Sequence, residues 1–244
     1  MVPLTRHGTR EMLIGTVVLA IVGTALGWWH WWLSLILLPV LVWLFAFFRD
    51  PERDLPAEQN TMVSPADGKV SDITEIEHDA LLGGPAVRVG IFLSVFNVHV
   101  NRSPCDGAVV DVTYKKGKFI NAMSHAKASD DNESNTIVLK EPAGAGRPVA
   151  VVKQIVGLIA RRIICTVKPG DVVVRGGRIG MIKFGSRTEL TIPKWLKPTI
   201  KVKVGDTVRG AADVIATLGE PIHTVAHGEV AEEFEPIVGR ETPA

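Results

Sequence analysis

The sequence predicts a mainly β protein, a pseudo-symmetric β sandwich or barrel, preceded by an N-terminal transmembrane or interfacial helical hairpin. Residues 12–48 contain no Asp, Glu, Lys or Arg. After residue 54, short runs rich in Val and Ile alternate with Gly, Pro and Asp, which is typical of strands joined by turns. Two turn-like segments also occur twice in this second part. We therefore expect an anchoring hairpin over residues 1–54 and a β domain over residues 55–244.

The uncharged N-terminal run is long enough for two helices. One helix crosses the hydrocarbon core of a bilayer with about 20 residues, and the apolar part of a signal peptide is only about 7–15 residues long. The middle of the run is rich in Trp, at residues 28–32, and indole rings prefer the headgroup level of a membrane. We predict two short helices, over residues 12–27 and 33–48, with this Trp cluster at the far interface.

Basic residues flank the predicted hairpin, with Arg6 and Arg10 before it and Arg49 and Arg53 after it. Positive charge next to apolar helices favours the cytoplasmic side of a membrane. We therefore expect a cell-membrane protein whose β domain lies on the cytoplasmic side. The alternative is one long tilted helix, which would place the β domain on the opposite side.

The second part of the chain contains several runs with the alternating or continuous apolar pattern of strands. They are residues 68–76, 86–93, 108–114, 136–139, 149–155, 162–167 and 200–204. A Gly-rich stretch over 172–183 and a further run over 189–192 flank the Gly185-Ser186 step. Residues 116–135 are predicted to form a long polar loop, and loops of this length in a compact domain often have a function.

Two sequence repeats predict the internal symmetry. The segment SPADGKV at 64–70 is similar to SPCDGAV at 103–109, and VKPGD at 167–171 is similar to VKVGD at 202–206. The second pattern resembles the turns of biotinyl/lipoyl-type domains. Because Gly-Asp turns also recur by chance in β proteins, the repeats support an architecture and not a function.

Composition argues against two classes of protein. The formal net charge is +1, and the chain has no basic patch interleaved with aromatic residues, so nothing indicates nucleic-acid binding. The two cysteines, Cys105 and Cys165, are far apart and lack metal-type spacing. We therefore expect neither a disulfide framework nor a zinc site.

Three polar residues stand out by their context: Asp67 in a Pro-Ala-Asp-Gly turn, His99 between apolar neighbours, and Ser186 after Gly185. Alone, each is more often a turn former or a satisfied core residue. Together they supply a carboxylate, an imidazole and a hydroxyl, the groups that activate a serine nucleophile. No G-x-S-x-G elbow is present, but a hydroxyl beside an unhindered glycine carbonyl is placed to attack the backbone of its own chain.

Four segments of the chain resemble the phosphatidylserine decarboxylase family, specifically its shorter prokaryotic type. They are VSPADG at 63–68, FNVHVNRSP at 96–104, residues 154–164, and FGSR at 184–187. The resemblance covers essentially the whole chain after the apolar run. The combination is specific, although no single segment is.

The resemblance implies a zymogen that cleaves its own chain. Ser186 would attack the Gly185 carbonyl, and the resulting ester would undergo β-elimination. The products would be a large β chain of residues 1–185 and a small α chain of residues 186–244 that begins with a pyruvoyl group derived from the serine. The two chains would remain associated, and a homo-oligomer is compatible with the family.

The resemblance also implies the reaction and the roles of two further residues. A Schiff base between the pyruvoyl group and the amine of phosphatidylserine would let CO2 depart, giving phosphatidylethanolamine in phospholipid biosynthesis without pyridoxal phosphate or a metal. His99 would act as the base in processing and as the proton donor after decarboxylation. Asp67 would hold the tautomer of His99.

Cations are expected near the phosphate and carboxylate of such a lipid. The candidates are Arg102, Arg161, Arg162 and Arg187. Longer family members typically have Leu-Gly-Ser-Thr at the cleavage site, where this chain has FGSR at 184–187, and they have a second histidine where Arg102 stands. These departures leave the nucleophile and the principal base in place, and they put only a role for a second histidine in doubt.

Two other functions stay open. A membrane-tethered biotinyl/lipoyl-like carrier or adaptor would present a modified lysine at a hairpin tip, and Lys183 loosely fits that pattern. A membrane-bound serine hydrolase would use Asp67, His99 and Ser186 without self-cleavage. Both functions predict one uncleaved chain, whereas the family resemblance predicts two fragments.

Overall fold

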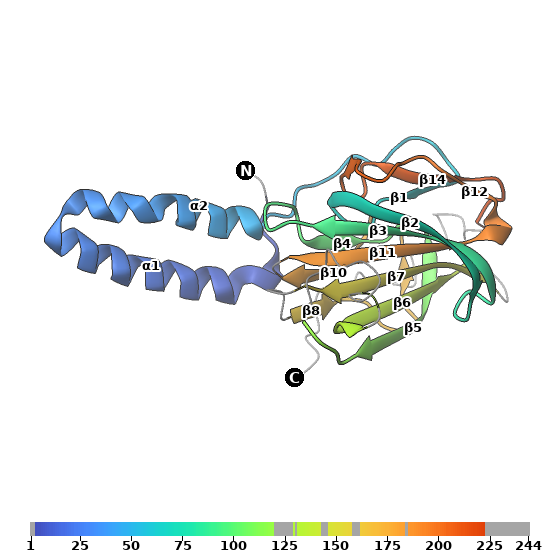
Figure 1. The fold of residues 1–244 in the computed structure, drawn as a ribbon, viewed down its shortest axis with the longest axis horizontal. Coiled ribbons are helices and arrows are strands. Elements are labelled where there is room, and N and C mark those ends of the chain that lie inside the picture. The colour runs from blue at the N-terminus through green and yellow to red at the C-terminus, as the bar shows by residue number, and fades with distance from the viewer. Residues whose placement is uncertain are drawn as a thin grey trace, which may run out of the picture.

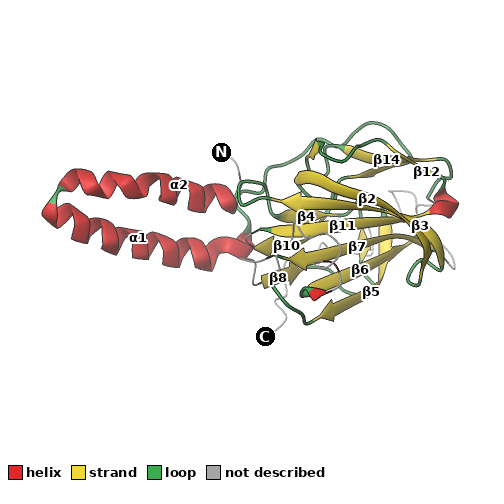
Figure 2. Ribbon diagram, in the orientation of Figure 1, coloured by secondary structure: helices red, strands yellow, loops and turns green. Residues whose placement is uncertain are grey.

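A helical hairpin extends from one end of a β unit in the computed structural model of this chain (Figure 1). The structure describes residues 3–119, 129, 131–142, 146–157, 162–183 and 185–222. Strands make up most of the β unit, and helices are almost confined to the N-terminal part (Figure 2). The predicted fold class, a mainly β protein behind an N-terminal helical hairpin, is confirmed.

The hairpin consists of a short turn η1 (Arg6–Gly8), a long helix α1 (Thr9–Trp29), a 3-10 segment η2 (Trp31–Leu37) and a second helix α2 (Leu38–Phe47). His30 adopts an extended conformation and separates the two arms, so the Trp cluster lies at the tip. Among the described residues, Arg6–Trp29 is the helical stretch long and apolar enough to cross a membrane, judged by length and composition, and Trp31–Phe47 is a shorter apolar helix. The helix predicted over residues 12–27 begins earlier in the structure, because α1 starts at Thr9.

Small residues bring the two arms of the hairpin together. The Ser34 hydroxyl of η2 donates a hydrogen bond to the Gly23 carbonyl of α1 at 3.1 Å. A Cβ at Gly15 would approach the Leu44 side chain to 2.6 Å. Close approach through small residues is the usual packing of helices in membranes, where polar bonds and contact replace the hydrophobic effect.

The eight-stranded sheet of the β unit is curled and has the order β13-β2-β3-β11-β7-β6-β5-β9. Its strands are β13 (Thr207–Val208), β2 (Gly68–Asp79), β3 (Gly84–Leu93), β11 (Ser186–Pro193), β7 (Pro148–Val156), β6 (Ser134–Lys140), β5 (Gly107–Lys115) and β9 (Val172–Val173). All neighbours are antiparallel. Strand β11, which begins at Ser186, lies in the middle of this sheet.

Two three-stranded sheets complete the β unit. The first is ordered β1 (Thr61–Val63), β14 (Val214–Leu218), β12 (Pro198–Ile200), and the second β4 (Val100–Arg102), β10 (Arg178–Lys183), β8 (Arg162–Cys165). A short 3-10 turn, η3 (Lys194–Leu196), follows β11. The main core joins the large sheet to these elements through buried side chains such as Val70, Ile91, Leu190, Ile179 and Ile215. Strand β10 leads directly to the Gly185-Ser186 step.

The predicted pseudo-symmetry is visible in matching hydrogen bonds of the repeated turns. The Ser64 hydroxyl donates to the Ala66 carbonyl, and the Ser103 hydroxyl donates to the Cys105 carbonyl, both at 2.7 Å. The second repeat matches too, because Asp171 and Asp206 each accept a backbone N–H from the residue three positions earlier. The repeats therefore fold as equivalent turns.

The two repeats also meet each other in the same way. Asp67 accepts the Gly210 backbone N–H, and Asp106 accepts the Arg175 backbone N–H, both at 2.7 Å. Strand β13 then pairs with the start of β2, just as β9 pairs with the start of β5. This contact gives Asp67 a structural role that its symmetry mate shares.

Most predicted strands lie inside observed ones. The run 162–167 extends two residues beyond β8, and of the run 200–204 only Ile200 belongs to a strand. Its second half turns instead, because Asp206 accepts the Lys203 N–H at 2.8 Å and Gly205 adopts a left-handed φ of 100°. The predicted polar loop 116–135 connects β5 to β6, which begins at Ser134, and much of it falls outside the described residues.

Candidate active site at the Gly185-Ser186 step

Gly185 connects β10 to β11 in a conformation that only glycine adopts easily. Its φ is 65°, in the left-handed region, and a Cβ added there would meet nothing within 4 Å. The need for glycine is therefore conformational and not a matter of space.

Ser186 is the first residue of β11 and is fully buried. Its backbone pairs with Leu93 of β3 on one side and Val156 of β7 on the other. The hydroxyl Oγ has no hydrogen-bond partner among the described residues. Leaving a buried hydroxyl unpaired costs about 1–3 kcal/mol, and such exceptions in a folded protein often mark a functional group.

His99 precedes β4 and has no solvent-exposed surface. Its Nδ1 lies 2.9 Å from the Asn97 carbonyl oxygen, and the Gly185 N–H donates to its Nε2 at 3.4 Å. A carbonyl can only accept, so the proton sits on Nδ1 and the lone pair of Nε2 faces the Gly185-Ser186 step. The imidazole is thereby oriented as a base towards the two residues that the sequence singled out.

Burial lowers the pKa of His99 to about 4; the hydrogen bond to Asn97 opposes this shift and the positive charge of Arg49 adds to it. The ring of Phe47, the last residue of α2, lies against the imidazole with the ring centres 4.3 Å apart and the planes tilted by 34°. A histidine with this pKa is neutral at physiological pH and is able to accept a proton.

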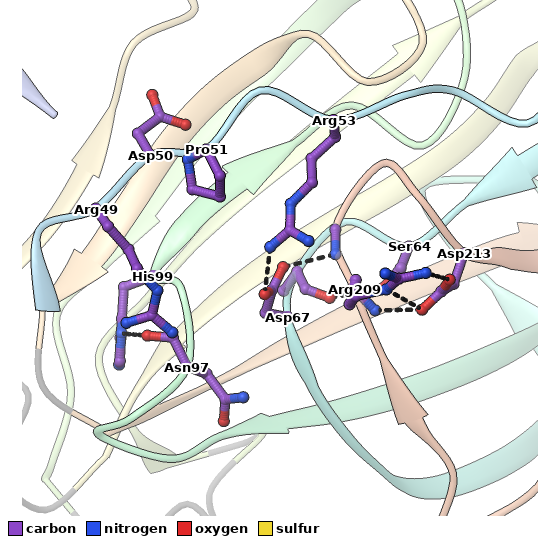
Figure 3. A network of polar contacts seen from close by, with 12 residues as sticks. Arg49, Asp50, Pro51, Arg53, Ser64, Asp67, Asn97, His99, Arg209 and Asp213 are labelled. Atoms are coloured by element: carbon purple, nitrogen blue, oxygen red, sulfur yellow. Dashed lines mark hydrogen bonds and ion pairs between the residues drawn. The ribbon is translucent and has the colours of Figure 1, made fainter. Parts of the chain in front are cut away.

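Asp67 does not hold the tautomer of His99, and that prediction is corrected. The Asp67 carboxylate accepts hydrogen bonds from Arg53 at 2.8 Å and from the Gly210 N–H at 2.7 Å. Figure 3 shows His99 beside Asn97, and Asp67 between Arg53 and the turn that carries Arg209. The backbone carbonyl of Asn97 takes the place that the triad pattern had assigned to a carboxylate. Burial raises the pKa of Asp67, while Gly210 and Arg53 oppose that shift.

Arg102 is committed to contacts inside the protein. Its guanidinium donates to the Asp50 carboxylate and to the Pro51 carbonyl, both at 2.9 Å, and to the Gly176 carbonyl at 3.1 Å. These contacts hold the segment that follows the hairpin against the β unit. The structure thus gives Arg102 a structural task and not a free guanidinium for a lipid headgroup.

Arg187 is likewise engaged and fully buried. It forms ion pairs with Asp72 of β2 at 2.7 Å and with Glu189 at 2.8 Å. Gly90 of β3 leaves the space for this guanidinium, because a Cβ there would collide with it. Arg162 of β8 is exposed, and Arg161 lies outside the described residues.

A buried chain of polar side chains lies next to Ser186, and the sequence reasoning did not find it. The side-chain amide of Asn101 donates to the Thr188 hydroxyl at 3.0 Å, and its side-chain oxygen Oδ1 accepts from Gln154 Nε2 at 2.9 Å. Gln154 Oε1 in turn accepts from Asn135 Nδ2 at 3.0 Å. Two signals were present, because Asn101 and Gln154 both lie in the segments that carry the family resemblance. Satisfied networks of this kind rigidify their surroundings.

Lys183 precedes the candidate site by two residues and is almost completely buried. Its ammonium group pairs with Glu11 of α1 at 2.5 Å, and its side chain is 5% exposed. A carrier lysine has to be reachable at a hairpin tip, so this burial disfavours the carrier hypothesis. Within the described part of the chain, no group of three or more His, Cys, Asp or Glu residues is arranged to hold a metal ion.

Comparison with known proteins gives a consistent result. A family model described as phosphatidylserine decarboxylase matches residues 41–216. Three relatives carry the name phosphatidylserine decarboxylase proenzyme. The protein from Rhodopirellula baltica is 44% identical over 214 residues, covering 88% of each chain. The one from Granulibacter bethesdensis is 47% identical over 212 residues, or 86% of this chain and 83% of the relative. The third, from Carboxydothermus hydrogenoformans, is 42% identical over 208 residues, or 84% and 92%. The chain belongs to the phosphatidylserine decarboxylase family and is a decarboxylase, a carboxy-lyase.

Proposed function

We propose that this chain is a self-processing phosphatidylserine decarboxylase that cuts itself between Gly185 and Ser186 and works with a pyruvoyl group made from Ser186. The observation that carries the proposal is the unpaired, buried Ser186 hydroxyl next to a left-handed glycine whose N–H faces His99 Nε2. The proenzyme names of the relatives support a processing step.

In the proposed cleavage, Ser186 Oγ attacks the Gly185 carbonyl carbon while His99 Nε2 takes the hydroxyl proton. The Gly185–Ser186 amide bond then breaks, and the imidazolium returns the proton to the leaving nitrogen of Ser186. Removal of the Ser186 Cα proton expels the Gly185 carboxylate from the ester. The dehydroalanine that remains tautomerises to an imine, and water releases ammonia from it to leave the pyruvoyl carbonyl.

The surroundings of Ser186 suit such a group, because the Ser186 Oγ that this chemistry consumes is buried and has no hydrogen-bond partner among the described residues. Once formed, the pyruvoyl carbonyl supplies the electron sink for loss of CO2 from an amino acid. With its pKa lowered to about 4, His99 is neutral at pH 7, the form that can accept the Ser186 proton. An anionic headgroup beside the ring would raise that pKa, and the same imidazole could then donate the proton that replaces CO2.

The hairpin supports a membrane location for the enzyme. Its outward side chains are apolar and exposed, including Leu13, Ile21 and Leu35, and Trp28 at the tip is 92% exposed. Such a surface is stable in lipid and not in water. We assign residues 1–54 to the membrane anchor and residues 55–244 to the catalytic domain, which lies on the cytoplasmic side with the Trp cluster at the far interface.

Of the four arginines predicted to contact the lipid headgroup, two are already occupied within the protein. Arg102 and Arg187 are occupied by carboxylates of the protein itself. Arg162 of β8 is exposed and pairs in register with Lys183 of the neighbouring strand β10. We assign Arg162, together with the adjacent Arg161, as the cations for the substrate phosphate.

The intact mass of the denatured protein tests the proposal. We expect two fragments, Met1–Gly185 and a shorter one beginning at position 186, whose N-terminus has no free amine and reacts with borohydride. The Ser186→Ala variant should remain one chain, and His99→Ala should process slowly or not at all. An active wild-type preparation that contains only the full-length chain would rule out the pyruvoyl mechanism. A full-length chain labelled by a serine-directed phosphonate would indicate the hydrolase instead.

A further inference from the structure

The end of the hairpin that lies against the β unit, called here the hairpin root, contains Glu11, Met12, Phe47 and Phe48. It contacts both the proposed base and the strand that leads to the proposed cleavage site. On the α2 side, the Phe47 ring covers the His99 imidazole. On the α1 side, Glu11 pairs with Lys183, two residues before Gly185 on the strand that ends at the scissile bond. The base and the scissile strand are therefore each held by a different arm of the hairpin.

Apolar packing joins these two contacts into one unit. Met12 of α1, Phe47 of α2, Phe48 directly after it and Met181 of β10 form a buried cluster of their own, separate from the main core. A Cβ at Gly8 would collide with the Phe48 ring. The cluster fixes the hairpin root against β10, because closely packed side chains cannot move apart without losing their contacts.

The segment after α2 also holds the loop that carries His99. The Arg49 guanidinium donates to the Ala46 carbonyl and to the Phe96 carbonyl, both at 2.6 Å. Asn97, whose carbonyl orients the imidazole, follows Phe96 directly. Arg49 thus connects the end of the hairpin to the residues that set the position of the base.

We infer that the hairpin root is a working part of the self-cleavage site and that Phe47 is a positioning residue for His99. The inference rests on the proposed function, since it assumes that His99 is the base for cleavage at Gly185. It departs from the view of the hairpin as a tether only. A tether brings the enzyme to its lipid, whereas cleavage of the chain uses no lipid at all.

Two physical effects follow from the contact. The Phe47 ring restricts the imidazole to the orientation in which Nε2 faces Gly185, and small misplacements of a reacting group reduce rates strongly. The ring also excludes water from His99, and a dry site keeps the imidazole neutral. The charged group that acts on His99 is Arg49, from the segment after α2. Lys183 and Glu11, on β10 and α1, neutralise each other nearby.

The test uses the full chain, synthesised in a cell-free system with nanodiscs of phosphatidylethanolamine and phosphatidylglycerol. The fraction cleaved is followed over time on denaturing gels between pH 3 and pH 8, a range that includes the pH midpoint expected for wild type near 4. Phe47→Ala is compared with Phe45→Ala, a matched loss of a ring from the same helix at an exposed position. Phe47→Leu keeps an apolar cover over the imidazole and serves as the conservative variant.

We expect Phe47→Ala to cleave about tenfold more slowly than wild type at pH 7. As the pH is lowered, cleavage of this variant should stop at a higher pH than cleavage of wild type. The reason is that water entering the site moves the pKa of His99 from about 4 towards the ordinary value of about 6.5. Phe47→Leu should return the pH midpoint to that of wild type and restore part of the rate. Phe45→Ala should match wild type in both measurements.

The outcomes separate this inference from the proposed function. If wild type is not cleaved, the proposed function fails. If wild type is cleaved and Phe47→Ala has the rate and pH midpoint of Phe45→Ala, the hairpin is a tether only and the inference is wrong. A slower rate with an unchanged pH midpoint in a variant of lowered thermal stability would show general destabilisation, and it too would overturn the role of Phe47.

Discussion

The imidazole of His99 is fully buried and titratable, so its protonation affects the stability of the fold as well as the proposed catalysis. Burial lowers its pKa in the folded chain to about 4 from 6.5. Above pH 6.5 the imidazole is neutral in both the folded and the unfolded chain, and it adds no pH dependence. Between pH 6.5 and pH 4 only the unfolded chain takes up the proton, so the folded state loses stability as the pH falls.

A pair of uncleaved variants measures this effect. Ser186→Ala should lose about 3 kcal/mol of unfolding free energy through His99 between pH 6.5 and pH 4, from a shift of this size at 1.36 kcal/mol per unit. The double variant Ser186→Ala/His99→Gln has no imidazole and should show a flatter profile over the same range. The slope of thermal midpoint against pH is the measurement, because the substitution also changes the absolute midpoint. Parallel profiles would contradict the buried neutral histidine.

The structure brings Gly185, Ser186 and His99 together, as the motifs suggested, whereas the hydrogen-bond partners of these residues were not predicted. The part of the three residues in cleavage stays a prediction. The acceptor for His99 is a backbone carbonyl, which every residue has, so no pattern could point to Asn97. Asp67 was given that role from the family resemblance and the triad pattern, and neither says which way its carboxylate points.

The hairpin helices meet through glycines of α1, and this makes the pair sensitive to added volume. At Gly15 a new side chain would run into Leu44 at the crossing. Gly15→Leu should lower the thermal unfolding midpoint of the protein in nanodiscs, because overpacking of a tight contact costs about 1–3 kcal/mol.

Ala20→Leu enlarges an exposed side chain on the same helix and is the control for Gly15→Leu. It should leave the midpoint unchanged, since lipid accepts the extra methyl groups. Equal effects of the two substitutions would mean that the arms of the hairpin do not pack as described. A lower midpoint for Ala20→Leu alone would have the same meaning.

At the scale of elements, the sequence predicted which segments form strands and failed on where the helices begin and end. Alternation of apolar residues marks a strand over its whole length, so β3, β5 and β7 were found almost in full. The start of α1 was missed because Arg10 and Glu11 were taken to lie outside an apolar helix. Glu11 lies in the first turn of α1, where the helix dipole favours a carboxylate. It also pairs with Lys183, a partner far away in sequence.

The whole molecule places the proposed break in the middle of its largest sheet. Strand β11 would be the first element of the small chain, yet it lies between β3 and β7 of the large chain (Figure 1). It pairs with β3 from Ser186 to Pro193 and with β7 from Ser186 to Thr191. Strands β13 and β14 of the small chain pair with β2 and β1 of the large chain in the same way. The sequence repeats predicted equivalent turns and did not indicate this interleaving of the two chains.

The two chains should therefore stay together under native conditions and separate only when the sheet unfolds. Among the contacts between them, the ion pair of Arg187 with Asp72 is buried on the arginine side and joins β11 to β2. Asp72→Asn should release the small chain at a lower urea concentration, because loss of a charged partner here costs about 2 kcal/mol. Glu77→Gln, an exposed change on the same strand, should not. Size-exclusion chromatography in a urea series makes the comparison, and release of the small chain without urea would contradict the interleaved sheet.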